Sequence, residues 1–154
     1  MPNITPWIWF DTEAEDAAEL YTSIFPNSRI TDVRRYGEAG PREAGTVMTV
    51  TFELDGQEFV GLNGGPEHNT HSPAVSFMVT CESQQEVDDY WTKLVDGGRE
   101  IACGWVTDRF GISWQVIPKC LSGLLGGENA QRVMQAMLQM KKIEIAELER
   151  AAAA

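Results

Sequence analysis

The pattern of hydrophobic and polar positions divides the chain into two similar halves and a helical end. In the first half, a short apolar run ends at Phe10, and apolar residues then recur at helical spacing until Pro26. Asp11 or Thr12 is expected to cap this helix. Strand segments follow over 29–36, 46–54 and 58–63, the last two joined by an Asp-Gly hairpin turn. The first half therefore predicts the order β-α-β-β-β.

The same pattern restarts after a polar linker. A strand is expected over 74–80, a helix over 83–95 and strands over 100–106 and 112–117, with a further strand short or split around Asp108. Tyr21 matches Tyr90, and Ala18 matches Val87, at one constant offset along the chain. This faint duplication predicts two α+β modules whose mostly antiparallel, curved sheets surround a shared cup.

The stretch 104–118 carries the clearest two-sided strand. Two strands are expected to meet at the turn Asp108-Arg109-Phe110-Gly111. Beyond the turn, apolar and polar residues alternate, so that one face packs and the other is free to line a site. The packing face holds Ile112, Trp114 and Val116, and the other holds Ser113, Gln115 and Ile117.

From Leu121 onward the pattern becomes helical. An apolar stripe runs along 130–140, and a second apolar segment follows it. These residues are Val133, Met134, Met137, Leu138, Ile143, Ile145 and Leu148. The stripe needs a cover, which is either the protein's own sheet or a second subunit, and its Met content favours a homodimer.

Composition narrows the classes of function. The 154 residues fit a single domain, 1–154, with module one at 1–65, a linker at 66–73, module two at 74–120 and a helical segment at 121–150. A net charge of −11 disfavours nucleic acid, and the lack of any apolar run of about 18 residues predicts no membrane span. Three cysteines without a CxxC pair suit a reducing compartment, so we expect a cytoplasmic protein.

A set of short motifs, spread over nearly the whole chain, resembles the PhnB-like family. The motifs are Ile4-Thr5-Pro6-Trp7, Ala17-Ala18-Glu19-Leu20-Tyr21, Phe25-Pro26-Asn27-Ser28, Gly61-Leu62-Asn63-Gly64-Gly65, Ser76-Phe77, Cys103-Gly104-Trp105, the stretch from Asp108 to Gln115, and Met140-Lys141-Lys142-Ile143. This family, often named 3-demethylubiquinone-9 3-methyltransferase-like, belongs to the vicinal oxygen chelate superfamily with glyoxalase I, extradiol dioxygenases and bleomycin-resistance proteins. The resemblance implies paired βαβββ modules of glyoxalase/bleomycin resistance type and a homodimer.

The resemblance also allows the superfamily's metal positions to be tested. Catalytic members hold a divalent metal with His or Glu side chains from four strands. The matching positions here are Gln115, Ala74, a position near Asn63, and one between Ile4 and Pro6. None of these is acidic or imidazole, so we predict no catalytic metal and no cofactor.

Six residues form the predicted ligand-binding cup. They are Asn63, Ser76, Trp105, Asp108, Ser113 and Gln115. Ser113 and Gln115 either hydrogen-bond a ligand or satisfy each other and water. Asn63 presents its amide to the cup or belongs to a turn, and a turn role is also favoured over a general base for Asp108. Trp105 is the preferred wall residue of the cup, whereas Trp114 is expected in the core.

Three other candidates fit structural interpretations better. Cys103 is interpreted as an inert thiol rather than a nucleophile, because no His lies near it in the sequence. His68 and His71 lie in a loop between prolines, which disfavours a metal pair. The glycines of 61–65 precede no helix, so they do not match the phosphate-binding turn of a nucleotide site.

These observations leave three functional hypotheses. The first is a metal-independent small-molecule binding protein that sequesters or senses an apolar or aromatic ligand. The second is a small-metabolite enzyme acting through Gln115, Ser113, Asn63 and Asp108, or, by family label only, a methyltransferase. The third is a structural homodimer in which the region 129–154 is the functional surface.

Overall fold

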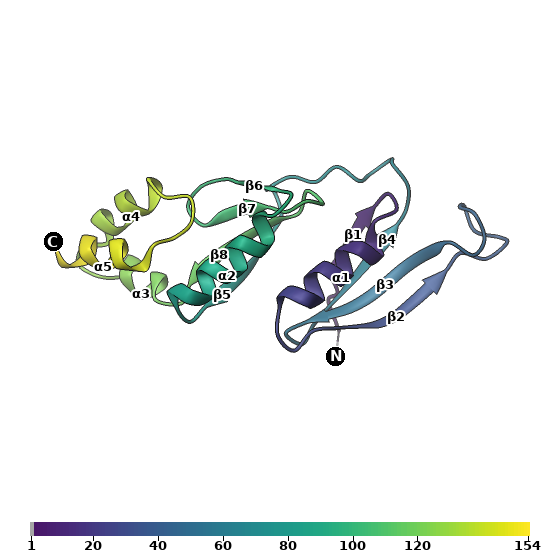
Figure 1. Ribbon diagram of the computed structural model, residues 1–154, viewed down its shortest axis with the longest axis horizontal. Coiled ribbons are helices and arrows are strands. Elements are labelled where there is room, and N and C mark those ends of the chain that lie inside the picture. The colour runs from purple at the N-terminus through teal and green to yellow at the C-terminus, as the bar shows by residue number, and fades with distance from the viewer. Residues whose placement is uncertain (1) are drawn as a thin grey trace. The chain divides into compact units, whose positions relative to one another are not determined.

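The computed structural model describes residues 2–154 and divides the chain into two compact units. The first unit spans Met1–Thr70 and the second His71–Ala154. Figure 1 shows that each unit is a sheet with one helix across it, and that the second unit also carries the C-terminal helices. Within the described residues, no helix is long and apolar enough to cross a bilayer.

The first unit has the predicted βαβββ order. Its elements are β1 (Trp7–Phe10), α1 (Ala14–Ile24), β2 (Arg29–Arg35), β3 (Val47–Leu54) and β4 (Gln57–Asn63). The strand order is β1-β4-β3-β2, in which β1 runs parallel to β4 and the other pairs are antiparallel. The helix packs on this sheet through residues such as Tyr21, whose ring lies 6.1 Å from that of Phe52. Apolar periodicity, together with Pro26 and the Asp-Gly turn, thus predicts this unit.

The start of α1 differs from the expectation. Neither Asp11 nor Thr12 caps the helix, and Glu13 at the N-cap position makes no side-chain capping bond. Instead, Asn63 at the end of β4 accepts a hydrogen bond from the Ala14 amide at 2.8 Å. The cap comes from a strand that is distant in sequence, so local rules did not predict it.

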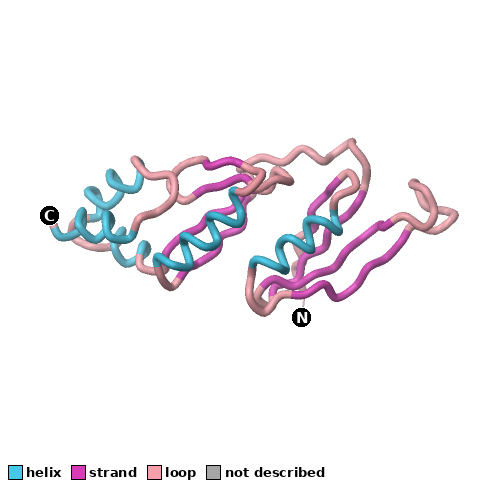
Figure 2. The backbone as a smooth tube through the Cα atoms, in the orientation of Figure 1, coloured by secondary structure: helices cyan, strands magenta, loops and turns pink. Residues whose placement is uncertain are grey.

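The second unit repeats the same topology. Its elements are β5 (Ser76–Cys81), α2 (Gln84–Val95), β6 (Arg99–Glu100), β7 (Trp105–Thr107) and β8 (Ser113–Pro118). The strand order is β5-β8-β7-β6, with β5 parallel to β8. Figure 2 shows the strands of each unit in magenta and its helices in cyan. The predicted α+β class with two βαβββ modules is confirmed.

Two details of the second unit correct the sequence interpretation. The strand expected over 100–106 is interrupted, because Cys103 and Gly104 adopt positive φ angles of 56° and 86°. This break makes β6 and β7 separate strands. In the helix, Trp91 rather than Tyr90 is buried in the position that Tyr21 has in α1, so the two helices match one residue later than proposed.

Three C-terminal helices form a small core of their own. They are α3 (Leu121–Leu125), α4 (Ala130–Leu138) and α5 (Ile145–Ala153). The core contains Leu121, Val133, Met140, Ile143 and Leu148, with Ile117 of β8 packed against it. The apolar stripe is therefore largely covered within the chain, and it no longer supplies a reason to expect a homodimer.

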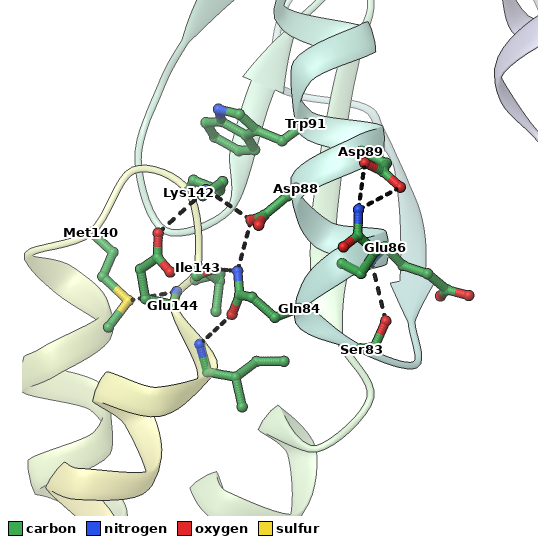
Figure 3. A network of polar contacts seen from close by, with 12 residues as sticks. Ser83, Gln84, Glu86, Asp88, Asp89, Trp91, Met140, Lys142, Ile143 and Glu144 are labelled. Atoms are coloured by element: carbon green, nitrogen blue, oxygen red, sulfur yellow. Dashed lines mark hydrogen bonds and ion pairs between the residues drawn. The ribbon is translucent and has the colours of Figure 1, made fainter.

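Polar contacts join the segment before α5 to α2 (Figure 3). The Gln84 amide donates to the Ile143 carbonyl at 3.0 Å and accepts from the Ile145 amide at 2.7 Å. Lys142 Nζ lies 2.7 Å from an Asp88 oxygen and 3.4 Å from a Glu144 oxygen. Hydrogen bonds from Lys142 and then Gln84 lower the pKa of Asp88, and the hydrogen bond to Asp88 raises the pKa of Lys142. Backbone and side-chain contacts together thus fix this segment on α2.

The same segment supports the Cys103-Gly104 break. The Cys103 amide donates to the Met140 carbonyl at 2.9 Å, and the Gly104 amide donates to the Lys141 carbonyl at 2.8 Å. A side chain at Gly104 would lie 2.8 Å from a methyl carbon of Ile117, and its positive φ also favours glycine. These contacts hold the backbone immediately before Trp105.

Candidate functional site

The two faces of the second sheet differ in what covers them. One face packs against α2, where Val87, Trp91 and Leu94 are buried. Glu100 of β6 points to this side, because it accepts a hydrogen bond from the Trp91 indole at 2.9 Å. We call the opposite side the open face. It carries Ser76, Met78 and Thr80 of β5, Arg99 of β6, Trp105 and Thr107 of β7, and Ser113, Gln115 and Ile117 of β8.

A line of polar side chains crosses the open face. Ser113 is paired with Ser76 on one side and with Thr107 on the other, and Thr107 is paired with Arg99. We call these four residues the polar row. The Ser113 and Thr107 hydroxyl oxygens are buried, and neither has a hydrogen-bond partner in the described part of the chain. Since buried hydroxyls in proteins are nearly always paired, these two oxygens are candidates for hydrogen bonds to a group from outside the described chain.

A second, less polar row lies beside the first. Trp105, Gln115 and Met78 are neighbours across β7, β8 and β5. The Gln115 amide donates to the Ser76 hydroxyl at 2.9 Å, which ties the two rows together. Trp105 is half-buried and Met78 is 60% exposed, so apolar surface adjoins the polar row. Beyond these rows, Ile117 packs against the C-terminal helices.

Asp108 serves the turn rather than the open face. Its carboxylate accepts hydrogen bonds from the Phe110 amide at 2.8 Å, the Ile112 amide at 3.1 Å and the Trp114 indole at 2.8 Å. The side chain is 3% exposed. These contacts match the favoured interpretation of Asp108 as a turn residue, and they bind the turn to the buried Trp114.

Asn63 is likewise occupied by backbone groups. Its oxygen accepts from the Ala14 amide, and its nitrogen donates to the Val47 carbonyl at 3.2 Å. The residue is 6% exposed. Both ends of the amide are thus used in holding α1 and β3 to β4.

The donor set does not fit the divalent metal of catalytic relatives. The Asn63 amide is engaged with backbone on both ends, and the Gln115 amide is hydrogen-bonded to Ser76. Ala74 offers no side-chain donor. Across residues 2–154, no three His, Cys, Asp or Glu side chains come together in a way that would hold a metal ion. We therefore derive no chemical step through a metal.

The remaining sequence candidates have local contacts of their own. Cys103 is half-buried in the backbone break, and His68 contacts the Trp9 ring edge-on with centroids 5.0 Å apart. Trp114 is 3% exposed, which confirms its expected place in the core.

Cys81 is a buried thiol of the second unit. Burial, and to a lesser degree the charge of Glu86, raises the pKa of the Cys81 thiol to about 12.

Sequence reasoning missed two members of the polar row, Thr107 and Arg99. Thr107 was recoverable, because a buried Val106 places its two neighbours on the other side of the strand. Arg99 was not, because β6 has only two residues and no alternation to read.

Comparisons with known proteins agree with this topology. The family model described as 3-demethylubiquinone-9 3-methyltransferase matches residues 2–117. A solved structure described as a putative 3-demethylubiquinone-9 3-methyltransferase, PhnB protein, from Bacillus cereus is 38% identical, with a TM-score of 0.69 over 76% of this chain and 99% of that one. Protein PA1353 from Pseudomonas aeruginosa is 18% identical, with a TM-score of 0.63 over 77% of this chain and 98% of that one. A glyoxalase-related enzyme from Fulvimarina pelagi is 12% identical, with a TM-score of 0.50 over 79% of this chain and 91% of that one. A search of curated proteins gave no match.

The fold and these likenesses define the class first: the chain has a fold of paired βαβββ modules, which the glyoxalase-related enzyme shares. The chain belongs to the PhnB-like, or 3-demethylubiquinone-9 3-methyltransferase, family. Helices α3, α4 and α5 lie beyond the residues that the family model matches.

Proposed function

We propose that this protein is a metal-independent small-molecule binding protein, which sequesters or senses a ligand on the open face of the second sheet. The observation that carries the proposal is the pair of buried, unpartnered hydroxyls of Ser113 and Thr107. Leaving a buried polar group without a partner costs roughly 1–3 kcal/mol each. Both oxygens are covered in the unliganded chain, so a ligand reaches them only after the side chains above them move aside. A ligand that then hydrogen-bonds both hydroxyls recovers this free energy, which gives the two residues a function in binding.

The neighbouring residues indicate the kind of ligand. Trp105 and Met78 offer aromatic and apolar surface beside the hydroxyls, and Gln115 offers an amide between them. Hydroxyls and an amide fix the orientation of a ligand, while apolar contacts supply most of the affinity. These neutral groups suit binding better than proton transfer, so the methyltransferase and glyoxalase names of similar proteins are not carried over as an activity.

If the two hydroxyls bind a ligand, removing them should raise the stability of the unliganded protein and lower its affinity for the ligand. The test measures both effects. Ser113→Ala and Thr107→Val each remove an unpartnered hydroxyl, so we expect the free energy of unfolding without ligand to rise by about 1 kcal/mol. The same variants should lose the thermal stabilisation that the wild type shows with compounds from a library of small aromatic molecules. Thr92→Val, on an exposed position of α2, is the matched control and should change neither property.

Two results would contradict the proposal. One is a loss of stability in both hydroxyl variants, which would mean that the hydroxyls have partners in the unliganded protein. The other is the lack of any stabilising compound for the wild type. Either result would mean that the polar row does not bind a ligand.

A homodimer, implied by the family resemblance, is part of the same proposal. Trp7 and Val75 are large apolar side chains that are 60% and 68% exposed in the single chain. Apolar exposure of this kind supports a contact with a second copy. Multi-angle light scattering tests the dimer, and a monomer at micromolar concentration would contradict it.

A further inference from the structure

We propose that the ligand carries a carboxylate, and that Arg99 binds this carboxylate at the end of the polar row. The inference rests on the proposed function and deepens it, since it names the chemical class of the ligand. The class is a small planar molecule, of one or two rings, with an acidic group at one end.

The backbone fixes Arg99 on the open face. Arg99 is paired with Thr107, and directly opposed residues of an antiparallel pair point to the same side of the sheet. The next residue, Glu100, points to the other side, where it binds the Trp91 indole. Gly98 permits this close approach of the strands, because a side chain there would lie 2.0 Å from the Thr107 carbonyl oxygen. Arg99 therefore continues the line of Ser76, Ser113 and Thr107.

The charge on Arg99 has no counterion on this face. The strand positions of the open face include no Asp or Glu, and Arg99 forms none of the salt bridges found in the described structure. The other nearby arginine, Arg109, is by contrast paired with Asp96 at 3.1 Å. A guanidinium without a partner is suited to a planar carboxylate, which it binds through two parallel hydrogen bonds.

The rest of the protein argues against any general attraction for acids. The net charge is −11, so the mean field repels an anion. A preference for an acid over its neutral analogue must therefore arise locally. On the open face, Arg99 is the only strand position that provides a positive charge.

The spacing of the sheet sets the size of the ligand. Adjacent strands lie about 4.8 Å apart, and positions two residues apart along a strand are separated by about 6.7 Å. A carboxylate near Arg99 and Thr107 then places an attached ring above Trp105 and Gln115, one row away. The distance between the two rows fits one ring or two fused rings. The Ser113 hydroxyl lies on the same side of the sheet as this ring.

The experiment compares an acid with its neutral analogue. The probes are 2-naphthoate and 2-naphthamide, which share the ring system and differ in charge. Binding is measured by calorimetry and by NMR with the full-length wild type, Arg99→Gln, Arg99→Lys and the control Arg132→Gln. Arg132 is exposed on α4, away from the strands. Arg132→Gln changes the net charge by the same amount as Arg99→Gln.

We expect the wild type and Arg132→Gln to bind the acid about ten-fold more tightly than the amide, because hydrogen bonds to charged groups add roughly this much. Arg99→Gln should abolish the preference, and Arg99→Lys should keep part of it. Equal binding of acid and amide by the wild type would overturn the inference and leave the proposed function standing. If neither probe bound the wild type at millimolar concentration, the inference would be overturned, whereas the proposed function would fall only if the compound library also gave no stabilising compound.

Discussion

The turn at Asp108 allows the sharpest stability prediction. Its carboxylate accepts three hydrogen bonds, two from backbone amides through one oxygen and one from the Trp114 indole through the other. Asp108→Asn keeps the shape of the side chain but leaves only one acceptor oxygen. If that oxygen stays with the two amides, the new NH2 group faces the indole N–H, and two donors meet in a buried place.

The expected cost follows from those contacts. One buried donor left without a partner costs roughly 1–3 kcal/mol, and replacing a charged acceptor by a neutral one weakens the two remaining bonds. We therefore expect Asp108→Asn to destabilise the second unit by about 2–4 kcal/mol. Asp96→Asn is the control, because Asp96 forms an exposed ion pair with Arg109, and such pairs contribute about 0–1 kcal/mol.

Urea unfolding, followed by tryptophan fluorescence and by NMR signals of each unit, measures the effect. The transition of the second unit should move to lower urea, whereas signals of the first unit should change much less. A shift equal to that of Asp96→Asn would refute the reasoning, since it would show that the three hydrogen bonds do not stabilise the turn.

Three further predictions concern other parts of the fold. The hydrogen bond from Lys142 lowers the pKa of Asp88, so the stabilisation from Asp88 is complete above about pH 4 and is lost as pH falls through the lowered native value. Urea midpoints of wild type and Asp88→Asn should therefore differ at pH 6, by no more than about 0.5 kcal/mol in stability, and converge near pH 2; a constant difference would contradict the pairing. Iodoacetamide at pH 8 should label the exposed Cys120 in the native protein and leave Cys81 unmodified, and mass spectra showing rapid labelling of Cys81 would contradict its burial. Asn63→Ala should destabilise the first unit by about 2 kcal/mol, measured by thermal unfolding, and a neutral result would refute its role as a helix cap.

The regular elements were predictable because their signals are local. Alternation along 112–117 placed Trp114 and Val116 on the packed face, and they are buried in β8. Apolar spacing up to Pro26 predicted α1, which ends at Ile24. The turn role of Asp108 followed from the same kind of local chemistry.

The features that escaped prediction depend on contacts between distant segments. Asn63 caps a helix that begins 49 positions earlier in the chain. The break at Cys103 is held by carbonyls of Met140 and Lys141, which no rule for strands would associate with it. The polar row combines residues from all four strands, so its composition is visible only once the register is known.

Native mass spectrometry of the purified protein, with elemental analysis of the same sample, tests the central claim most directly. The wild type and a Ser113→Ala, Thr107→Val double variant are prepared in parallel. The account predicts a small organic molecule retained by the wild type, absent from the variant, with no stoichiometric metal. A stoichiometric divalent metal, or the same ligand-free mass for both proteins, would contradict it.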